Sequence, residues 1–247
     1  MRLFVKCFAV LATVLCIGSV SLAQDEGGLK GEAAAIADAR AMVETMGGLE
    51  IWAALNSVHF VHEWDLANRQ EAYLENEILD LTAPRSYVTM ESETYTRIRA
   101  YSPEHRYWNI VNGEFAYASD ASFERAISRA PYSIYRLARA IGRNDPTLTI
   151  EYGNPESIPR GQALQFTFDG DEPGGWLLLN ARKEPIVWAT TQYEYMFGPL
   201  ARFGNLWVPN WANSSGGLVR YEMVSLKGSN KVPDMALFIP PETTVSD

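Results

Sequence analysis

The sequence predicts a mainly β protein with helices, of the α+β class, in which one strongly curved antiparallel sheet packs helices against its concave face. Segments with alternating apolar and polar residues recur along most of the chain, and turn residues separate them, which is typical of short half-buried strands. Two further segments carry apolar residues at intervals of three and four, the spacing of an amphipathic helix. A curved sheet must bury its concave face, and these helices are the available cover.

The first 23 residues have the pattern of an export signal. Arg2 and Lys6 form a short basic start, an apolar run follows, and small residues precede the expected cleavage point. We therefore expect an exported, periplasmic protein whose mature chain begins near Gln24. Both cysteines of the chain lie within the signal, and we expect no lipid anchor at Cys16 because the bulky Leu15 precedes it.

The remaining length fits one domain. A chain of this size can bury a sizeable core without disulfides or a structural metal. We divide the sequence into the signal at 1–23, a single domain at 24–241 and a flexible tail at 242–247.

A first helix is predicted between Gly31 and Met46. Ile36, Ala39 and Val43 recur at helical spacing, and the pair Gly47-Gly48 follows as a stop signal. The segment should therefore end sharply before the first strand.

From Val58 onward the apolar period changes to two, so that Phe60, His62 and Trp64 share one face of a strand. The predicted strands span 58–66, 72–81, 85–91, 95–101, 106–111, 114–118, 148–152, 163–168, 176–180, 186–196, 206–211 and 218–226. A helical stretch at 121–142 interrupts this meander, and Pro131 within it should kink it or split it into two helices.

Composition and motifs exclude several classes of function. The formal net charge is -9, which makes nucleic acid an unexpected partner. Thiol chemistry is excluded once the signal is removed, and His59 and His62 lie three apart on a strand and so on opposite faces, which disfavours a metal site. The chain has no nucleophilic-serine elbow, phosphate loop or zinc-protease motif. We expect no cofactor, no catalytic residue, no enzyme activity and a monomeric protein.

Paired carboxylates are the one enzymatic alternative. The candidates are Glu75, Glu77 and Asp80 on the second predicted strand and Glu91 and Glu93 on a later one. A same-face pair of these can act as acid and base if it is buried in a cleft. The alternation of Glu75 and Glu77 with Leu74 and Ile78 instead indicates an outward polar face.

The order of the predicted elements and short motifs resembles that of a known family. The marks are the helix ending in Met46-Gly47-Gly48, Pro84-Arg85 entering a strand, the strand, Asn-Gly turn and strand between Trp108 and Asp120, and the closing segments at 203–209 and 237–241. In these features the chain resembles the superfamily of LolA- and LolB-type outer-membrane lipoprotein carriers and their lipid-binding relatives, over nearly the whole mature sequence. The resemblance implies an unclosed antiparallel β-barrel with a helical lid or plug over an apolar cavity that holds acyl chains.

Aromatic residues make up 12% of the chain, so something large and apolar is being packed, either a core or a ligand. Twelve apolar residues are candidate ligand contacts because they would line the concave side of the sheet or face it from the helical stretch. They are Phe60, Trp64, Val88, Met90, Trp108, Ile110, Ile134, Leu137, Ile141, Phe166, Phe168 and Trp188. One acyl chain buried among them would gain on the order of 10 kcal/mol before the costs of binding.

We therefore expect a periplasmic carrier or binding protein for lipid-like molecules or lipoprotein acyl chains. One alternative is a sensory or assembly module that contacts envelope proteins, with Trp207 and Trp211 as a contact patch if they are exposed. A third interpretation is a periplasmic hydrolase that uses the paired carboxylates.

Overall fold

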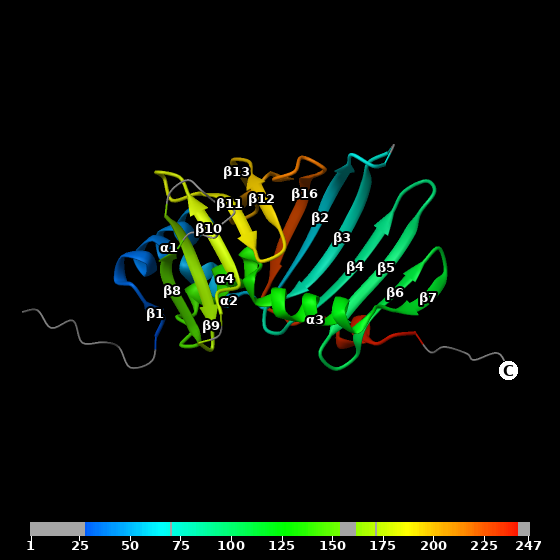
Figure 1. Ribbon diagram of the computed structural model, residues 1–247, viewed down its shortest axis with the longest axis horizontal. Helices are drawn as coiled ribbons and strands as arrows, with labels where there is room; N and C mark the ends of the chain where they lie inside the picture. The colour runs from blue at the N-terminus through cyan, green and yellow to red at the C-terminus, as the bar shows by residue number, and fades with distance from the viewer. Residues whose placement is uncertain (1–27, 70, 154–161, 171, 242–247) are drawn as a thin grey trace, which may run out of the picture.

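The computed structural model describes residues 28–69, 71–153, 162–170 and 172–241 (Figure 1). The predicted export signal and the predicted tail lie outside these residues. Within the described residues the dominant element is one sheet of 14 strands, and a separate hairpin pairs β13 (Leu200–Phe203) with β14 (Leu206–Pro209). In spatial order the strands of the large sheet are β1 (Lys30–Gly31), β8 (Leu148–Gly153), β9 (Ala163–Phe168), β10 (Gly175–Leu179), β11 (Pro185–Thr190), β12 (Glu194–Phe197), β15 (Trp211–Ser214), β16 (Val219–Ser229), β2 (Ser57–Leu66), β3 (Tyr73–Asp80), β4 (Arg85–Glu91), β5 (Thr96–Ser102), β6 (Arg106–Val111) and β7 (Glu114–Tyr117).

The large sheet is curved and open. Its end strands, β1 and β7, lie at opposite ends of the strand order, and all its neighbouring strands are antiparallel except β1 and β8. The prediction of a mainly β chain with helices and one unclosed, largely antiparallel sheet is thus confirmed. The barrel and the lid stay predictions.

The predicted first helix is confirmed as α1 (Ala33–Thr45), which is followed by the short α2 (Leu49–Ala54). Gly47 and Gly48 join them with positive φ angles of 124° and 113°, a conformation that glycine adopts without strain. The glycine pair therefore ends the first helix and reverses the chain, as its position in the sequence predicted.

The predicted break at Pro131 is also confirmed. The helical stretch divides into α3 (Asp120–Arg129), a single 3-10 turn η1 (Ala130–Tyr132) and α4 (Ile134–Gly142). Ser119 and Ser133 cap the two α-helices, because each side chain accepts a hydrogen bond from a backbone N–H in the first turn. The two α-helices are therefore separate elements, each with its own N-terminal cap.

Two predicted strands are wrong in extent. The alternation at 186–196 spans a hairpin, in which β11 ends at Thr190 and β12 begins at Glu194. The hydroxyl of Thr190 accepts hydrogen bonds from the backbone N–H groups of Gln192 and Tyr193 and so closes the turn. The segment at 206–211 likewise runs from β14 into β15 across Pro209, which has no N–H to donate.

The main core lies between the helices α1, α2 and α4 and one face of the sheet. Met42 and Trp52 from the first two helices and Leu137 and Ile141 from α4 are fully or almost fully buried. They form one cluster with residues of β8, β9 and β10, including Phe166. At this end of the sheet the helices fill the concave face.

The opposite face of β4 to β6 carries a smaller core. Trp108 packs there with Ala100 and with Phe238, which comes from the 3-10 turn η2 (Met235–Phe238) near the end of the described chain. The indole N–H of Trp108 donates to the backbone oxygen of Phe238 at 2.9 Å. Ile110 packs against the same cluster.

The prediction that Trp108 and Ile110 line the concave side is therefore wrong. Trp108 pairs with Ala100, whereas the preceding residue of β5, Arg99, points to the other face and pairs with Asn109. Other segments cover both faces of this part of the sheet. The alternate apolar residues of β6 therefore mark a buried face, but they do not show whether that face is the concave one.

Candidate functional site

A pocket of about 330 Å³ lies where the helices stop covering the concave face. The sheet contributes side chains from β2, β3, β5, β11, β12 and β16, and the chain from the end of α3 to the start of α4 borders it from the other side. Nine aromatic residues line the pocket, namely Phe60, Trp64, Tyr101, Tyr135, Trp188, Tyr193, Tyr195, Phe197 and Tyr221. Its polar lining consists of His62, Glu75, Glu77, Arg99, Arg129, Ser133 and Arg136, and Leu79, Ala130 and Ile134 complete it.

The aromatic wall is a series of ring contacts that crosses the middle of the sheet. Trp188 stacks on Tyr195 at 6.0 Å, Tyr195 contacts Tyr221 at 6.2 Å, and Tyr221 meets Trp64 at 4.9 Å between ring centroids. Trp188 with Tyr195, and Trp64 with Tyr221, are directly opposed across neighbouring strands. β15 lies between Tyr195 and Tyr221 and presents the small Ala212 opposite Tyr221, which leaves room for the rings to meet.

The polar side of the pocket is built on β3 and β5. Glu75 is buried and its Oε1 accepts from the Arg99 guanidinium at 3.2 Å. Burial raises the pKa of Glu75, and the charge of Arg99 acts in the opposite direction. Glu77, two residues along the same face, accepts a hydrogen bond of 2.6 Å from the hydroxyl of Ser86. Two carboxylates therefore share one cavity with aromatic rings.

This arrangement overturns the interpretation of β3 as a strand with its glutamates outward. Glu75 is only 4% exposed, whereas Leu74 is 46% exposed on the other face. Glu75 is directly opposite His62 on β2, and His62 is in phase with the buried Phe60. The pairing of β3 with β2 therefore decides which residues of β3 point inward, because residues directly opposite each other lie on the same face of the sheet. The polarity of β3 itself does not decide it.

His62 lies between the two parts of the lining. Its side chain is 5% exposed, and its ring stacks on Tyr221 at 4.1 Å and contacts Phe60 at 4.7 Å. Within the described chain its Nε2 atom has no hydrogen-bond partner. Burial lowers the pKa of His62 to about 3, so the imidazole is neutral at physiological pH. His59 is exposed on the opposite face, as the alternation predicted.

The helical border is fixed to the sheet by polar contacts. Arg136 donates to backbone carbonyl oxygens in the turn between β3 and β4, including that of Asp80 at 2.8 Å. The indole of Trp188 donates to the backbone oxygen of Tyr132 at 2.8 Å, and the Arg129 guanidinium lies 4.8 Å from the ring centre of Tyr193. The border thus contacts the sheet on both sides of the pocket.

The twelve candidate residues do not form one surface. Phe60, Trp64, Ile134 and Trp188 line the pocket. The others lie elsewhere: Val88 and Met90 in a neighbouring cluster with Tyr73, Leu137, Ile141 and Phe166 in the main core, Phe168 against Tyr132 at the edge of that core, and Trp108 and Ile110 on the opposite face. Whether any of them binds a ligand stays a prediction.

Sequence reasoning missed the polar lining and part of the aromatic wall. The sequence singles out Glu75 and Glu77 only as a possible acid–base pair and not as part of the aromatic site. It does not single out His62, Tyr195 or Tyr221 as site residues. The alternation of β2 already places His62 in phase with Phe60, which was the available signal. The positions of the two tyrosines depend on long-range pairing and had no local signal.

The predicted contact patch is reduced to one exposed ring. Trp207 is 41% exposed. Trp211 is half-buried, packs against Gly198 and lies under the guanidinium of Arg220 at 5.5 Å. A role of these residues in binding envelope proteins stays a prediction.

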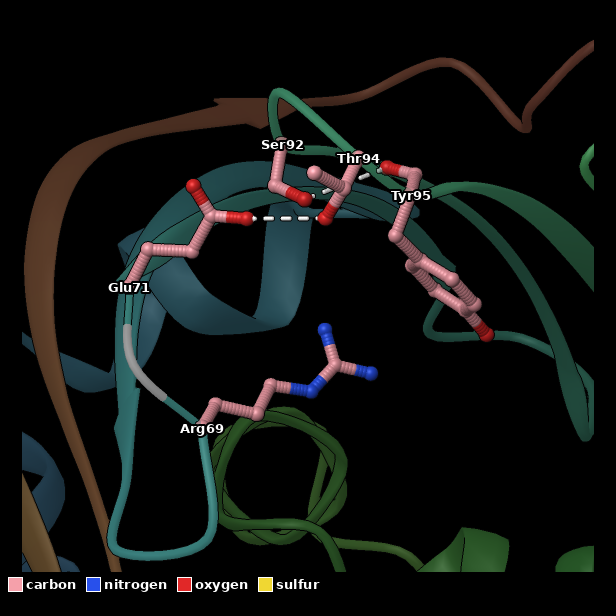
Figure 2. A pocket seen from close by; sticks show the side chains of 5 residues that line it. All are labelled: Arg69, Glu71, Ser92, Thr94 and Tyr95. Carbon is pink, nitrogen blue, oxygen red and sulfur yellow. Dashed lines mark hydrogen bonds between the residues drawn. The ribbon is translucent and has the colours of Figure 1, made fainter.

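A larger hollow, about 640 Å³, lies among the loops at one end of the sheet (Figure 2). Its polar groups already have partners, because Thr94 donates to Glu71 at 3.0 Å and Ser92 donates to the backbone oxygen of Tyr95. The Arg69 guanidinium lies 4.7 Å from the ring centre of Tyr95. The aromatic pocket, which holds an unpartnered buried polar atom, is therefore the stronger candidate site.

Two features are absent from the residues that the structure describes. These residues contain no cluster of three or more potential metal-ligating side chains. Their helices include none with the length and apolar character needed to cross a membrane.

No protein-family model and no curated protein matches the chain. Among solved structures, it is similar to a DUF1329 family protein from Desulfovibrio piger, with 9% sequence identity over 82% of this chain and 96% of that chain, and a TM-score of 0.45. It is also similar to MucB, with 11% identity over 86% of this chain and 65% of that chain, and a TM-score of 0.24. Both scores are low, so the function has to be argued from the pocket, and the resemblance to the LolA- and LolB-type carriers stays a prediction.

Proposed function

We propose that the protein is an exported binding protein or carrier that holds one apolar chain of a lipid-like molecule in the aromatic pocket. The observation that carries the proposal is the continuous aromatic wall beside a small set of buried polar groups. Ligand sites are typically concave, largely apolar and about 300–1,000 Å³ in volume, with a few polar groups that fix orientation. The pocket has this composition and lies at the lower end of this size range.

The volume limits the size of the cargo. A space of about 330 Å³ holds about eleven groups of methylene or water size at roughly 30 Å³ each. Ten buried methylenes would contribute about 8 kcal/mol before the costs of immobilising the ligand. The proposal is therefore a single chain, and it does not extend to the several acyl chains of a lipoprotein.

Export is the second part of the proposal and rests on the sequence of residues 1–23. Apolar molecules need a carrier in an aqueous compartment such as the periplasm. A protein with an aromatic pocket and a predicted export signal fits this need.

The test is to purify the protein and identify what it carries by native mass spectrometry and solvent extraction, then to titrate it with a fluorescent fatty-acid probe. Ile134→Trp should reduce probe uptake because the larger side chain enters the pocket. Ile239→Trp is the matched control, since Ile239 is 51% exposed and is not among the residues that line the pocket. A protein that is always empty and takes up no probe would refute the proposal.

A second candidate function follows from Glu75 and Glu77, which line the same pocket. Residues two apart on a strand lie roughly 7 Å apart, a separation at which two carboxyl groups can act as acid and base. The raised pKa of Glu75 suits a proton donor. Hydrolysis of chromogenic glycosides and esters, abolished separately by Glu75→Gln and Glu77→Gln, would support a hydrolase; turnover unaffected by both substitutions would exclude it.

A further inference from the structure

His62 and Trp64 both line the pocket, and each has a buried nitrogen without a hydrogen-bond partner among the described residues. Of the two side chains, only the His62 imidazole can accept a hydrogen bond as well as donate one. It is almost completely buried, and aromatic rings pack against it from its own strand and from β16. Its Nε2 atom has no hydrogen-bond partner in the described part of the chain. Buried polar side chains are nearly always hydrogen-bonded, so an unpartnered one at a cavity calls for an explanation such as a missing ligand group.

The charges around His62 restrict what that ligand group can be. Glu75 is directly opposite His62 on β3 and forms an ion pair with Arg99. Arg99, which could attract an anion, is already paired with Glu75. A ligand carboxylate or phosphate at His62 would lie beside the Glu75 carboxylate, and like charges in a buried site repel strongly. The other two arginines of the pocket are turned to other partners, Arg129 to the ring of Tyr193 and Arg136 to backbone carbonyl oxygens.

A neutral group meets the requirement better. A neutral imidazole has one nitrogen that donates and one that accepts, and either nitrogen can carry the proton. A hydroxyl both donates and accepts, so it satisfies His62 in either tautomer.

We propose that the pocket selects apolar molecules that end in a hydroxyl group, and that this hydroxyl hydrogen-bonds to the imidazole of His62. This inference rests on the proposed function and names the chemical class of its ligand. The aromatic wall binds the alkyl chain of such a molecule, and His62 hydrogen-bonds to its hydroxyl group. The Glu75 carboxylate disfavours a carboxylic acid of the same chain length by charge repulsion.

The experiment is a competition with three probes of equal chain length, each displacing the fluorescent dye phenylnaphthylamine from the purified protein. The probes are decanol, decanoate and chlorodecane, in which chlorine replaces the hydroxyl by a group of similar size that is a poor hydrogen-bond partner. We expect decanol to bind about tenfold more tightly than chlorodecane, which corresponds to one good buried hydrogen bond. Decanoate should be the weakest of the three.

His62→Phe should abolish the preference, so that decanol and chlorodecane bind equally, while the dye is still bound. His62→Gln keeps a donor and an acceptor and should restore part of the preference. His59→Phe is the matched control, because His59 is on the same strand but exposed on the opposite face, and it should leave the preference unchanged. Glu75→Gln should improve decanoate binding relative to decanol.

The outcomes separate the two proposals. If the dye binds but wild-type protein does not distinguish decanol from chlorodecane, the hydroxyl inference is wrong and the apolar-carrier proposal survives. A preference that persists in His62→Phe would assign it to another group and overturn the inference. If neither the dye nor any probe binds, both proposals fail.

Discussion

Arg136 should be a key residue for stability, because it is a buried cation whose guanidinium partners among the described residues are all backbone carbonyls. Its guanidinium donates to the oxygens of Asp80 at 2.8 Å, Ala130 at 2.8 Å, Ala83 at 2.9 Å and Arg85 at 2.8 Å. The side chain is 6% exposed. It therefore ties the first turn of α4 and the preceding 3-10 turn to the connection between β3 and β4.

The effect of Arg136→Met can be estimated from these four bonds. Methionine keeps much of the apolar stem, so the main loss is the hydrogen bonds. The bonds to Asp80 and Ala130 are fully buried, and each lost hydrogen bond from a charged donor costs about 1.5–3 kcal/mol. The free energy of unfolding should fall by about 4 kcal/mol. Lysine should rescue little, because a single ammonium cannot reproduce the planar fork that reaches four oxygens.

Urea unfolding at neutral pH, followed by tryptophan fluorescence, measures this change. Arg143→Met is the control. Arg143 also donates a hydrogen bond to a backbone carbonyl, the oxygen of Ala53 at 3.3 Å, but its side chain is exposed. It should change stability by less than about 0.5 kcal/mol. A loss below about 1 kcal/mol for Arg136→Met would refute the argument that backbone carbonyls depend on this cation.

Three further predictions follow from other contacts. Phe238→Ala should lower stability by about 3–5 kcal/mol and shift the fluorescence of Trp108 to longer wavelength, since Phe238 is fully buried against it; an unchanged spectrum would contradict this packing. Gly47→Ala should cost about 2 kcal/mol or more in thermal unfolding, because φ is 124° and the new Cβ would lie 2.6 Å from a backbone carbonyl oxygen. The pKa of His62 is about 3 in the folded protein, and its ordinary value is 6.5. Between these pH values the unfolded chain therefore binds a proton at His62 that the folded chain does not. The free energy of unfolding should fall by about 1.4 kcal/mol per pH unit as the pH drops below 6.5. His62→Phe should flatten this part of the profile and His59→Phe should not, as denaturation at several pH values would show.

Much of the fold could be predicted from local pattern. The first helix, its glycine stop and the break at Pro131 follow from residues that act within one or two turns. The alternation of β2 correctly placed Phe60 and His62 on a common buried face. These features need no knowledge of distant partners.

The extent of several strands and the face of others could not be predicted in the same way. The hairpin turn at Thr190 has no glycine or proline to mark it. The inward face of β6 was misassigned because η2, more than a hundred residues later, covers Trp108. Local polarity cannot reveal which distant segment will cover a strand.

The candidate site was predicted only in part for a related physical reason. Apolar residues in the inward phase identify where a sheet is buried, but they do not separate a filled core from a cavity. At the end of the sheet where helices pack, Leu137, Ile141 and Phe166 fill the space and are at most 1% exposed. In the middle, polar residues take the inward positions, with Glu75 opposite His62, and a pocket of about 330 Å³ remains. Charged and hydrogen-bonding side chains cannot close a cavity by apolar packing alone, because their polar atoms need partners. In this chain, polar residues in phase with aromatic ones therefore mark the boundary at which the core ends and a binding site can begin.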